Sequence, residues 1–420
     1  MTASTSTKEQ CTLNNTKNIN SFGIKDVLKS AAIFGANGSG KSNLADAMAT
    51  FRNIVLGSLD SVGDQEIKSA MPFVLKNDYF DIPTEFEVTF LSEGNLYRYG
   101  IAISNDEIME EWFYWTKTAR ETLLFHRERQ TVQINQRSFS EAKMFTKKDG
   151  DKLLIEKTKP HIPFISVLSQ FDGKKSNIAI DWFKKLVVIS GLQDLAFKEF
   201  TINLFENDIK FKKWALDILK SMQIHDIKIS EIERKLPKRP DVINDSDLND
   251  ALLKLESFFT RNNKHLKEKN IDVIKIDIET NKPFSLPLGM ESEGTKKLIY
   301  LLGPLYDAIR KDEILVIDEF DNKFHTLLCK FIIGLYNEKN NGLSQLIITC
   351  HDTNLLSNEL FRRDQIWFVE KNNKHESELY SLVEYKEHYT RKENSYSKDY
   401  LLGKYGAIPL FSSITELDDV

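Results

Sequence analysis

Cysteine is scarce in this chain, and its few cysteines stand far apart. The 420 residues include three, at positions 11, 329 and 350. An odd number at such spacing argues against a disulfide framework and fits no pattern of metal ligands. The eight histidines are dispersed as well, so we expect no zinc site. Scarce, unpaired cysteine is typical of a reducing compartment.

Long apolar runs are also missing. No stretch approaches the roughly 18 apolar residues that a membrane-spanning helix needs. The first seven residues, Met1–Thr7, have neither the positive charge nor the apolar core of a signal peptide. The sequence therefore predicts no membrane association and a cytoplasmic location.

The chain has no excess of basic residues. Its 57 lysines and arginines are outnumbered by 62 acidic residues, for a formal net charge of −5. This balance argues against nucleic-acid binding by the surface as a whole. A local basic segment remains, where Lys235, Lys238 and Arg239 precede an acidic stretch. A solvated loop is the favoured interpretation of this segment, and nucleic acid stays open as a partner.

The most informative segment is Gly35–Ser42, which matches the phosphate-binding pattern G-x-x-x-x-G-K-[ST] in full. The apolar run 31–34 before it predicts a buried strand, and apolar residues at helical spacing follow it. Glycines let successive backbone N–H groups face a phosphate chain. An ordinary glycine-rich turn is the alternative, which the strand and helix context disfavours. The predicted nucleotide-binding residues are Gly35, Asn37, Gly38, Ser39, Gly40, Lys41, Ser42 and Asn43.

Two later strands end in residues suited to phosphoryl transfer. The run 313–319 ends in Asp318 and Glu319, and the run 345–350 is followed by His351. Ligands collect at the carboxyl ends of parallel strands. We predict that Lys41 bridges the β- and γ-phosphates and that Ser42 and Asp318 hold Mg²⁺.

The catalytic interpretation extends to the two remaining residues. Glu319 is predicted to orient or deprotonate the attacking water, and His351 to contact the γ-phosphate. The alternatives are an exposed acidic loop after a buried strand and a structural histidine. Both lose weight once a phosphate loop is present in the same chain.

Length and texture predict an α/β protein of several parts. The apolar share of 41% and the charged share of 28% are ordinary for a globular protein. Residues 1–135 contain the phosphate loop and then antiparallel strands, with a hairpin around Gly94-Asn95. Residues 136–270 are expected to form a mostly helical inserted lobe, including a helix over 181–189. Residues 271–420 return to alternating strands and helices, with a loop at 283–288.

The order of these motifs resembles an ABC-type ATPase. After the Walker A segment come a signature-like Ser292-Glu293-Gly294-Thr295, a Walker B strand at Ile314–Asp318, a D-loop-like Asp321-Asn322 and the switch histidine. More closely, the chain resembles ATPases of bacterial phage-defence operons, relatives of the overcoming-lysogenization-defect nucleases and of the PARIS-type and abortive-infection ATPase subunits. The segments that carry this likeness are 34–44, 83–88, 97–100, 291–295 and 398–409.

This resemblance implies a function and partners. The fold would be an ABC-type P-loop NTPase head that binds ATP and Mg²⁺. Ser292 and Gly294 would contact the γ-phosphate of ATP on a facing subunit, so that an ATP sandwich forms a homodimer or larger homo-oligomer. Without the resemblance, this segment could equally be a plain helix N-terminus. The 69 residues after His351 are too few for a fused Toprim nuclease, so we expect a separate nuclease or toxin as effector, and a phage-encoded trigger.

The sequence also departs from the family pattern. A pair of strands usually precedes the phosphate loop, and residues 1–30 show no good strand, so we expect this pair to be missing. A Q-loop glutamine is not evident around 71–76. The main rival is a DNA-repair or chromosome-maintenance ATPase that binds DNA, although the sustained heptads of a coiled-coil arm are absent. A scaffold with little hydrolysis and a transporter ATPase are less favoured.

Overall fold

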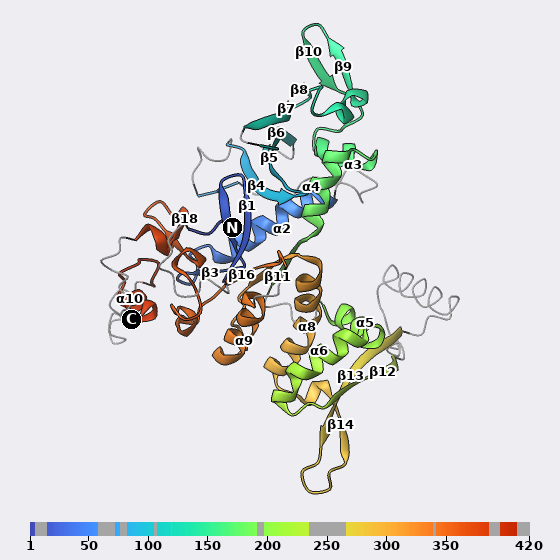
Figure 1. The fold of residues 1–420 in the computed structure, drawn as a ribbon, viewed down its shortest axis with the longest axis vertical. Helices are drawn as coiled ribbons and strands as arrows, with labels where there is room; N and C mark the ends of the chain where they lie inside the picture. Colours follow the sequence, from blue (N-terminus) through green and yellow to red (C-terminus); the bar gives the residue numbers. More distant parts are fainter. Residues whose placement is uncertain are drawn as a thin grey trace, which may run out of the picture. The chain divides into compact units, whose positions relative to one another are not determined.

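The computed structural model describes residues 1–4, 15–57, 72–75, 82–104, 107–118, 120–190, 197–234, 266–338, 342–385 and 395–409, and Figure 1 shows the ribbon. Contacts divide the chain into two compact units. Unit 1 comprises Met1–Leu192 and Ala308–Val420, and unit 2 comprises Gln193–Asp307. These limits differ from the domain boundaries expected at 135/136 and 270/271.

The described residues of unit 1 contain a six-stranded sheet. Its strands, in spatial order, are β11 (Leu186–Ser190), β15 (Ile314–Asp318), β16 (Gln345–Thr349), β3 (Ser30–Phe34), β17 (Ile366–Lys371) and β18 (Ser377–Ser381). The first five run parallel, and β18 is antiparallel to β17. Every residue of β3 is buried, as expected for the centre of a parallel sheet. The sheet and its helices confirm the predicted α/β class.

Two helices flank the strands that carry the motifs. Helix α2 (Lys41–Gly57) starts directly after the phosphate loop and packs on β11 and β15. Helix α9 (Thr326–Asn337) connects β15 to β16. Turns occupy the segment between β15 and this helix, and the N-cap is His325, whose Nδ1 accepts from the N–H of Leu327.

A strand pair precedes the phosphate loop, so the expectation that this pair is missing was wrong. Strands β1 (Thr16–Ser21) and β2 (Ile24–Leu28) pair antiparallel, and Thr2 forms a bridge to Val27. Apart from Ile19, β1 consists of polar residues, so it gives little alternation to detect. Its pairing register is also irregular between Asn18 and Ser21.

An antiparallel sheet of seven strands lies in the described part of unit 1. Its order is β4 (Thr84–Ser92), β5 (Asn95–Ser104), β6 (Glu107–Thr116), β7 (Glu121–Glu128), β8 (Thr131–Ile134), β10 (Lys152–Ile155) and β9 (Thr146–Asp149). The predicted hairpin is confirmed, since Ser92 pairs with Asn95 across a turn with positive φ at Glu93 and Gly94. This sheet shares an aromatic core with α2, in which the ring of Phe51 lies 5.9 Å from that of Tyr99.

The stretch 136–270 is less helical than the sequence predicts. It contains η2 (Ser140–Phe145), α3 (Phe164–Gln170) and α4 (Lys174–Lys184), but also β9, β10 and β11. The helix predicted over 181–189 ends at Lys184. The following Val187, Val188 and Ile189 are β-branched, and they extend as β11 beside β15.

Unit 2 combines helices with a small sheet. It contains α5 (Lys198–Asn207), α6 (Ile209–Leu219), η3 (Lys220–Met222), β12 (Asp226–Arg234), β13 (Leu266–Ile276), β14 (Pro283–Pro287), η4 (Leu288–Met290) and most of α8 (Glu293–Lys311). Helix α6 buries an apolar stripe formed by Phe211, Ala215, Ile218 and Leu219. The predicted loop at 283–288 is instead the edge strand β14, where prolines at both ends are tolerated.

The C-terminal part of unit 1 closes against the β17–β18 hairpin. It adds η5 (Thr353–Leu355), η6 (Arg363–Gln365), η7 (Leu382–Glu384) and α10 (Tyr396–Leu401). The hydroxyls of Tyr380 and Tyr385 both donate to the carbonyl of Tyr405, at 2.7 and 2.8 Å. Among the described residues, no helix is both long and apolar enough to cross a membrane.

A fully buried ion pair ties the antiparallel sheet to α3. Glu111 and Arg127 have no exposed side-chain surface, and Arg127 Nη1 lies 3.2 Å from Glu111 Oε2. The same carboxylate accepts from the N–H groups of Phe164 and Ile165 and from the hydroxyl of Tyr99. Glu111 thus satisfies N–H groups at the start of α3.

We expect Glu111→Ala to lower the free energy of unfolding by about 3–5 kcal/mol, because it leaves the Arg127 charge and two helix N–H groups buried and unpaired. Chemical denaturation followed by tryptophan fluorescence measures this. The control is Glu110→Ala at the neighbouring position, where the Glu110 side chain is 52% exposed. This change should lower the free energy of unfolding by no more than about 0.5 kcal/mol. Equal costs for the two variants would contradict the structural role of Glu111.

Candidate functional site

The phosphate loop is held in a tight curve between β3 and α2. A Cβ atom at Gly35 would lie 2.4 Å from the carbonyl oxygen of Val369 on β17. Gly40 has φ +111°, and a Cβ there would lie 2.4 Å from Ser377 Oγ. Gly38 has φ +74° and open space around it. The loop therefore needs glycine at these positions for two reasons, close approach and backbone conformation.

Lys41 is buried at the start of α2. Its Nζ donates to the carbonyls of Gly35 and Ala36 at 2.8 and 3.0 Å. Burial lowers the pKa of Lys41, and the carboxylates of Asp318 and Asp321, with a smaller contribution from Glu319, oppose this by favouring the charged form. Lys41 therefore lies within electrostatic range of the acidic residues that follow β15.

A threonine on the neighbouring strand organises those acidic residues. Thr349 Oγ1 donates to Asp318 Oδ1 at 2.6 Å and accepts from the backbone N–H of Glu319 at 2.8 Å. Asp318 is buried. Glu319 is half-buried with φ +48°, so the chain turns sharply out of the strand at this residue. Thr349 was not predicted from the sequence, because a threonine at a strand end carries no motif of its own.

Asp321 connects the segment after β15 to the backbone of His351. Its Oδ2 accepts from the N–H of His351 at 2.8 Å and from the N–H of Asp352. Its Oδ1 is buried and has no hydrogen-bond partner among the described residues. The backbone of His351 is thereby fixed, while its side chain is exposed.

The structure brings most predicted site residues to one edge of the six-stranded sheet. The phosphate loop, Asp318, Glu319 and His351 follow the carboxyl ends of β3, β15 and β16 in unit 1. Within the loop, Asn37, Gly38 and Asn43 are exposed, Ser42 is half-buried, and Ser39 is buried with no hydrogen-bond partner for its Oγ.

The signature-like residues Ser292 and Gly294 belong to unit 2 instead. Ser292 Oγ accepts from the N–H of Thr295 at 3.1 Å, so this serine caps helix α8. The capping role matches the plain reading of the segment and is compatible with an anion at the helix N-terminus. The basic residues Lys235, Lys238 and Arg239 lie outside the described residues.

The donor set at the sheet edge fits a nucleotide with Mg²⁺. The loop and the N-terminus of α2 supply N–H groups and the Lys41 ammonium for phosphate oxygens. The Ser42 hydroxyl and the Asp318 carboxylate are the oxygen ligands that Mg²⁺ prefers. Two buried atoms at this edge, Asp321 Oδ1 and Ser39 Oγ, have no hydrogen-bond partner among the described residues. Polar groups of the edge are therefore left to bond a ligand.

The phosphate loop, the carboxylates at the end of β15 and His351 after β16 lie on one sheet, and an antiparallel sheet packs on the helix after the loop. These features define an ABC-type P-loop ATPase fold. The chain belongs to the family described as "AAA domain, putative AbiEii toxin, Type IV TA system", whose model matches residues 30–357. This match runs from the start of β3 to beyond His351. No curated protein matches the chain.

Several solved structures resemble the chain at low identity. The SMC head domain from Thermotoga maritima is 15% identical, with 87% of this chain and 96% of that chain covered and a TM-score of 0.33. The Smc head domain bound to the C-terminal domain of ScpA, derived from Pyrococcus furiosus, is 15% identical over 87% and 94%, with a TM-score of 0.31. RecF with ATP is 11% identical over 87% and 97%, with a TM-score of 0.29.

We expect Thr349→Val to lower ATP turnover about 10- to 100-fold, because Asp318 loses its donor and the Glu319 N–H loses its acceptor. Phosphate release measured across a Mg²⁺ titration tests this. Thr349→Ser keeps the hydroxyl and should retain most of the rate. A valine variant as active as the wild type would contradict the role of this hydroxyl.

Proposed function

We propose that the protein is a Mg²⁺-dependent ATPase. The observation that supports this most is that the strands leading to the buried Lys41 and to Asp318 and Glu319 end at the same edge of one sheet. Lys41 would contact the β- and γ-phosphates, and Ser42 and Asp318 would hold the metal. Bound Mg²⁺ would neutralise charge on the phosphate oxygens.

Glu319 and His351 would act on the γ-phosphate side. Glu319, at the sharp turn after β15, orients the attacking water and accepts its proton. His351, with its backbone fixed by Asp321, donates to the γ-phosphate. The geometry supports these roles because both residues leave neighbouring strands at the same edge as Lys41.

The proposal extends to a homodimer or larger homo-oligomer. Ser292 and Gly294, at the start of α8, would contact the γ-phosphate of ATP bound to a facing subunit. The N-terminus of α8 carries the partial positive charge and the N–H groups that an anion needs. ATP occupancy would then control assembly.

The family supports a proposal for the biological role. Its description names the AbiEii toxin and a Type IV toxin–antitoxin system. We place this chain, as a cytoplasmic ATP-driven sensor or scaffold, in control of a separate effector, a nuclease or toxin, in bacterial anti-phage defence. A phage-encoded protein would be the trigger.

We expect the protein to bind ATP and to form an ATP-dependent oligomer that carries a second chain when expressed with its neighbouring genes. Lys41→Ala should lose ATP binding, because it removes the ammonium that meets the phosphates. Glu319→Gln should bind ATP, hydrolyse it at least about 100-fold more slowly and accumulate the oligomer. Native mass spectrometry with a phosphate-release assay measures all three properties.

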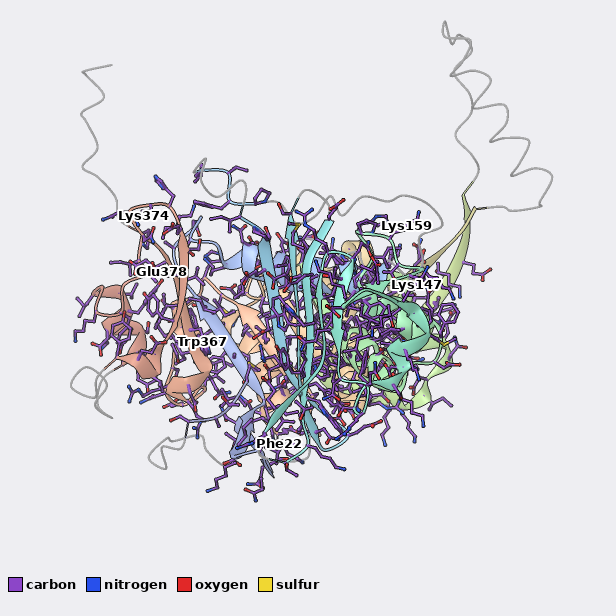
Figure 2. The ribbon with its side chains drawn as sticks, turned by 90° about the horizontal axis from the view of Figure 1, so that it is seen from above. Phe22, Lys147, Lys159, Trp367, Lys374 and Glu378 are labelled. Carbon is purple, nitrogen blue, oxygen red and sulfur yellow. The ribbon has the colours of Figure 1, made fainter. Side chains whose placement is uncertain are left out.

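The matched control for the lysine is Lys147→Ala, an exposed lysine of β9 that Figure 2 labels. It should behave as the wild type. Unchanged ATP binding in Lys41→Ala would contradict the ATPase proposal. A Glu319→Gln variant that stays monomeric and releases phosphate at the wild-type rate would favour a DNA-maintenance ATPase instead. Binding of DNA by the protein without a second chain would favour the same alternative.

A further inference from the structure

The hairpin formed by β17 and β18 lies directly against the phosphate loop. Strand β17 pairs in parallel with β3, the strand that leads into the loop. The turn of the hairpin is internally bonded, since Asn372 Oδ1 accepts from the N–H groups of Lys374 and Glu376. Figure 2 locates the hairpin by its labelled residues Trp367, Lys374 and Glu378.

Three close approaches join this hairpin to the loop. Ser377 Oγ, at the start of β18, donates to the carbonyl of Ser39 at 2.7 Å. The same hydroxyl lies 2.4 Å from the position that a Cβ at Gly40 would take, and the carbonyl of Val369 on β17 stands at the same distance from a Cβ at Gly35. The hairpin thus contacts the loop at its first glycine and at the glycine before Lys41.

The bond from Ser377 fixes the direction of a peptide group in the loop. In a planar trans peptide the C=O and the following N–H point in opposite directions. Because the carbonyl of Ser39 is directed at Ser377, the N–H of Gly40 points away from the hairpin. In a phosphate loop such N–H groups are the donors to the phosphates.

The hairpin has its own support. Tyr380 on β18 donates to the carbonyl of Tyr405, and Gly406 packs so closely that a Cβ there would lie 2.6 Å from Glu370 Oε2. The segment 395–409 therefore backs the hairpin, and the hairpin meets the loop through Ser377.

We propose that Ser377 is a positioning residue for ATP binding, which it serves by holding the Ser39–Gly40 peptide group in the orientation that presents the Gly40 N–H to phosphate. Ser377 stands far from the Walker A motif in sequence and belongs to no nucleotide-binding pattern. This inference rests on the proposed ATP binding.

The test compares Ser377→Ala with the wild type. We expect the Kd for ATP, measured by isothermal calorimetry, and the KM for hydrolysis to rise about three- to tenfold, the value of one hydrogen bond. The kcat should stay within about twofold, because Glu319 and His351 are untouched. The melting temperature without nucleotide should be nearly unchanged, because the Ser377 side chain is exposed.

Ser381→Ala is the matched control. It removes a hydroxyl at the other end of β18, where Ser381 Oγ donates to the carbonyl of Ile366 at 3.3 Å and accepts from the N–H of Val383. It should lower the melting temperature and leave the Kd for ATP unchanged. An equal loss of ATP affinity in both variants would overturn the positioning role, since it would reflect strand stability alone.

The remaining outcomes separate this inference from the proposed function. If the wild type binds ATP and this binding requires Lys41, an unchanged Kd for ATP in Ser377→Ala would overturn this inference and leave the proposed function standing. A wild-type protein that does not bind ATP would overturn the proposed function and the inference with it.

Discussion

The parallel register of β15, β16, β3 and β17 is the constraint on which the site depends. Ile317 pairs with Ile348, Thr349 with Ile33, and Phe34 with Phe368. The residues that follow these pairs therefore leave the sheet at a common edge, although they come from opposite ends of the chain. Buried apolar strands of five or six residues make this register hard to shift, because a one-residue slip would turn every side chain to the other face.

Hydrogen bonds across that edge then convert neighbouring strand ends into one site. Thr349 bonds both Asp318 and the backbone of Glu319, and Asp321 bonds the backbone of His351. Each link joins the end of β15 to the end of β16. The position of the His351 backbone is therefore tied to the segment that follows β15.

The sequence predicted those parts of the fold where a single physical requirement, such as a positive φ angle, restricts which residues can occur. The phosphate loop and the hairpin at Gly94 need particular backbone conformations, so their residues are diagnostic. The sequence predicted helix over strand β11, because the apolar run of β11 directly follows helix α4 and its hydrophobic period does not distinguish a strand from a helix. Strand β1 was missed because it is polar, and β2 because its apolar residues Ile24, Val27 and Leu28 do not alternate.

The site residues that could be predicted are likewise those that one chemical demand selects. Motif residues such as Lys41 and Asp318 are recognised by type and order. Their supports, Thr349 and Ser377, are single hydroxyl residues whose value depends on which strand lies alongside. Only the tertiary pairing of β16 with β15, and of β17 with β3, gives them a partner. The roles assigned to the site residues themselves stay predictions.

The glycines of the phosphate loop carry less information about ligand than their motif suggests. At Gly35 and Gly40, the atoms nearest to a Cβ belong to the β17–β18 hairpin, Val369 O and Ser377 Oγ, each at 2.4 Å. Gly38 differs, because nothing lies within 4 Å of a Cβ there and its positive φ is the sole local demand. Lys41 and Ser42, together with the curved backbone that the hairpin helps to hold, are therefore the features that favour phosphate. A loop shaped by the protein in advance lowers the entropy that ligand binding must offset, so the hairpin that restricts the glycines also prepares the loop for its ligand.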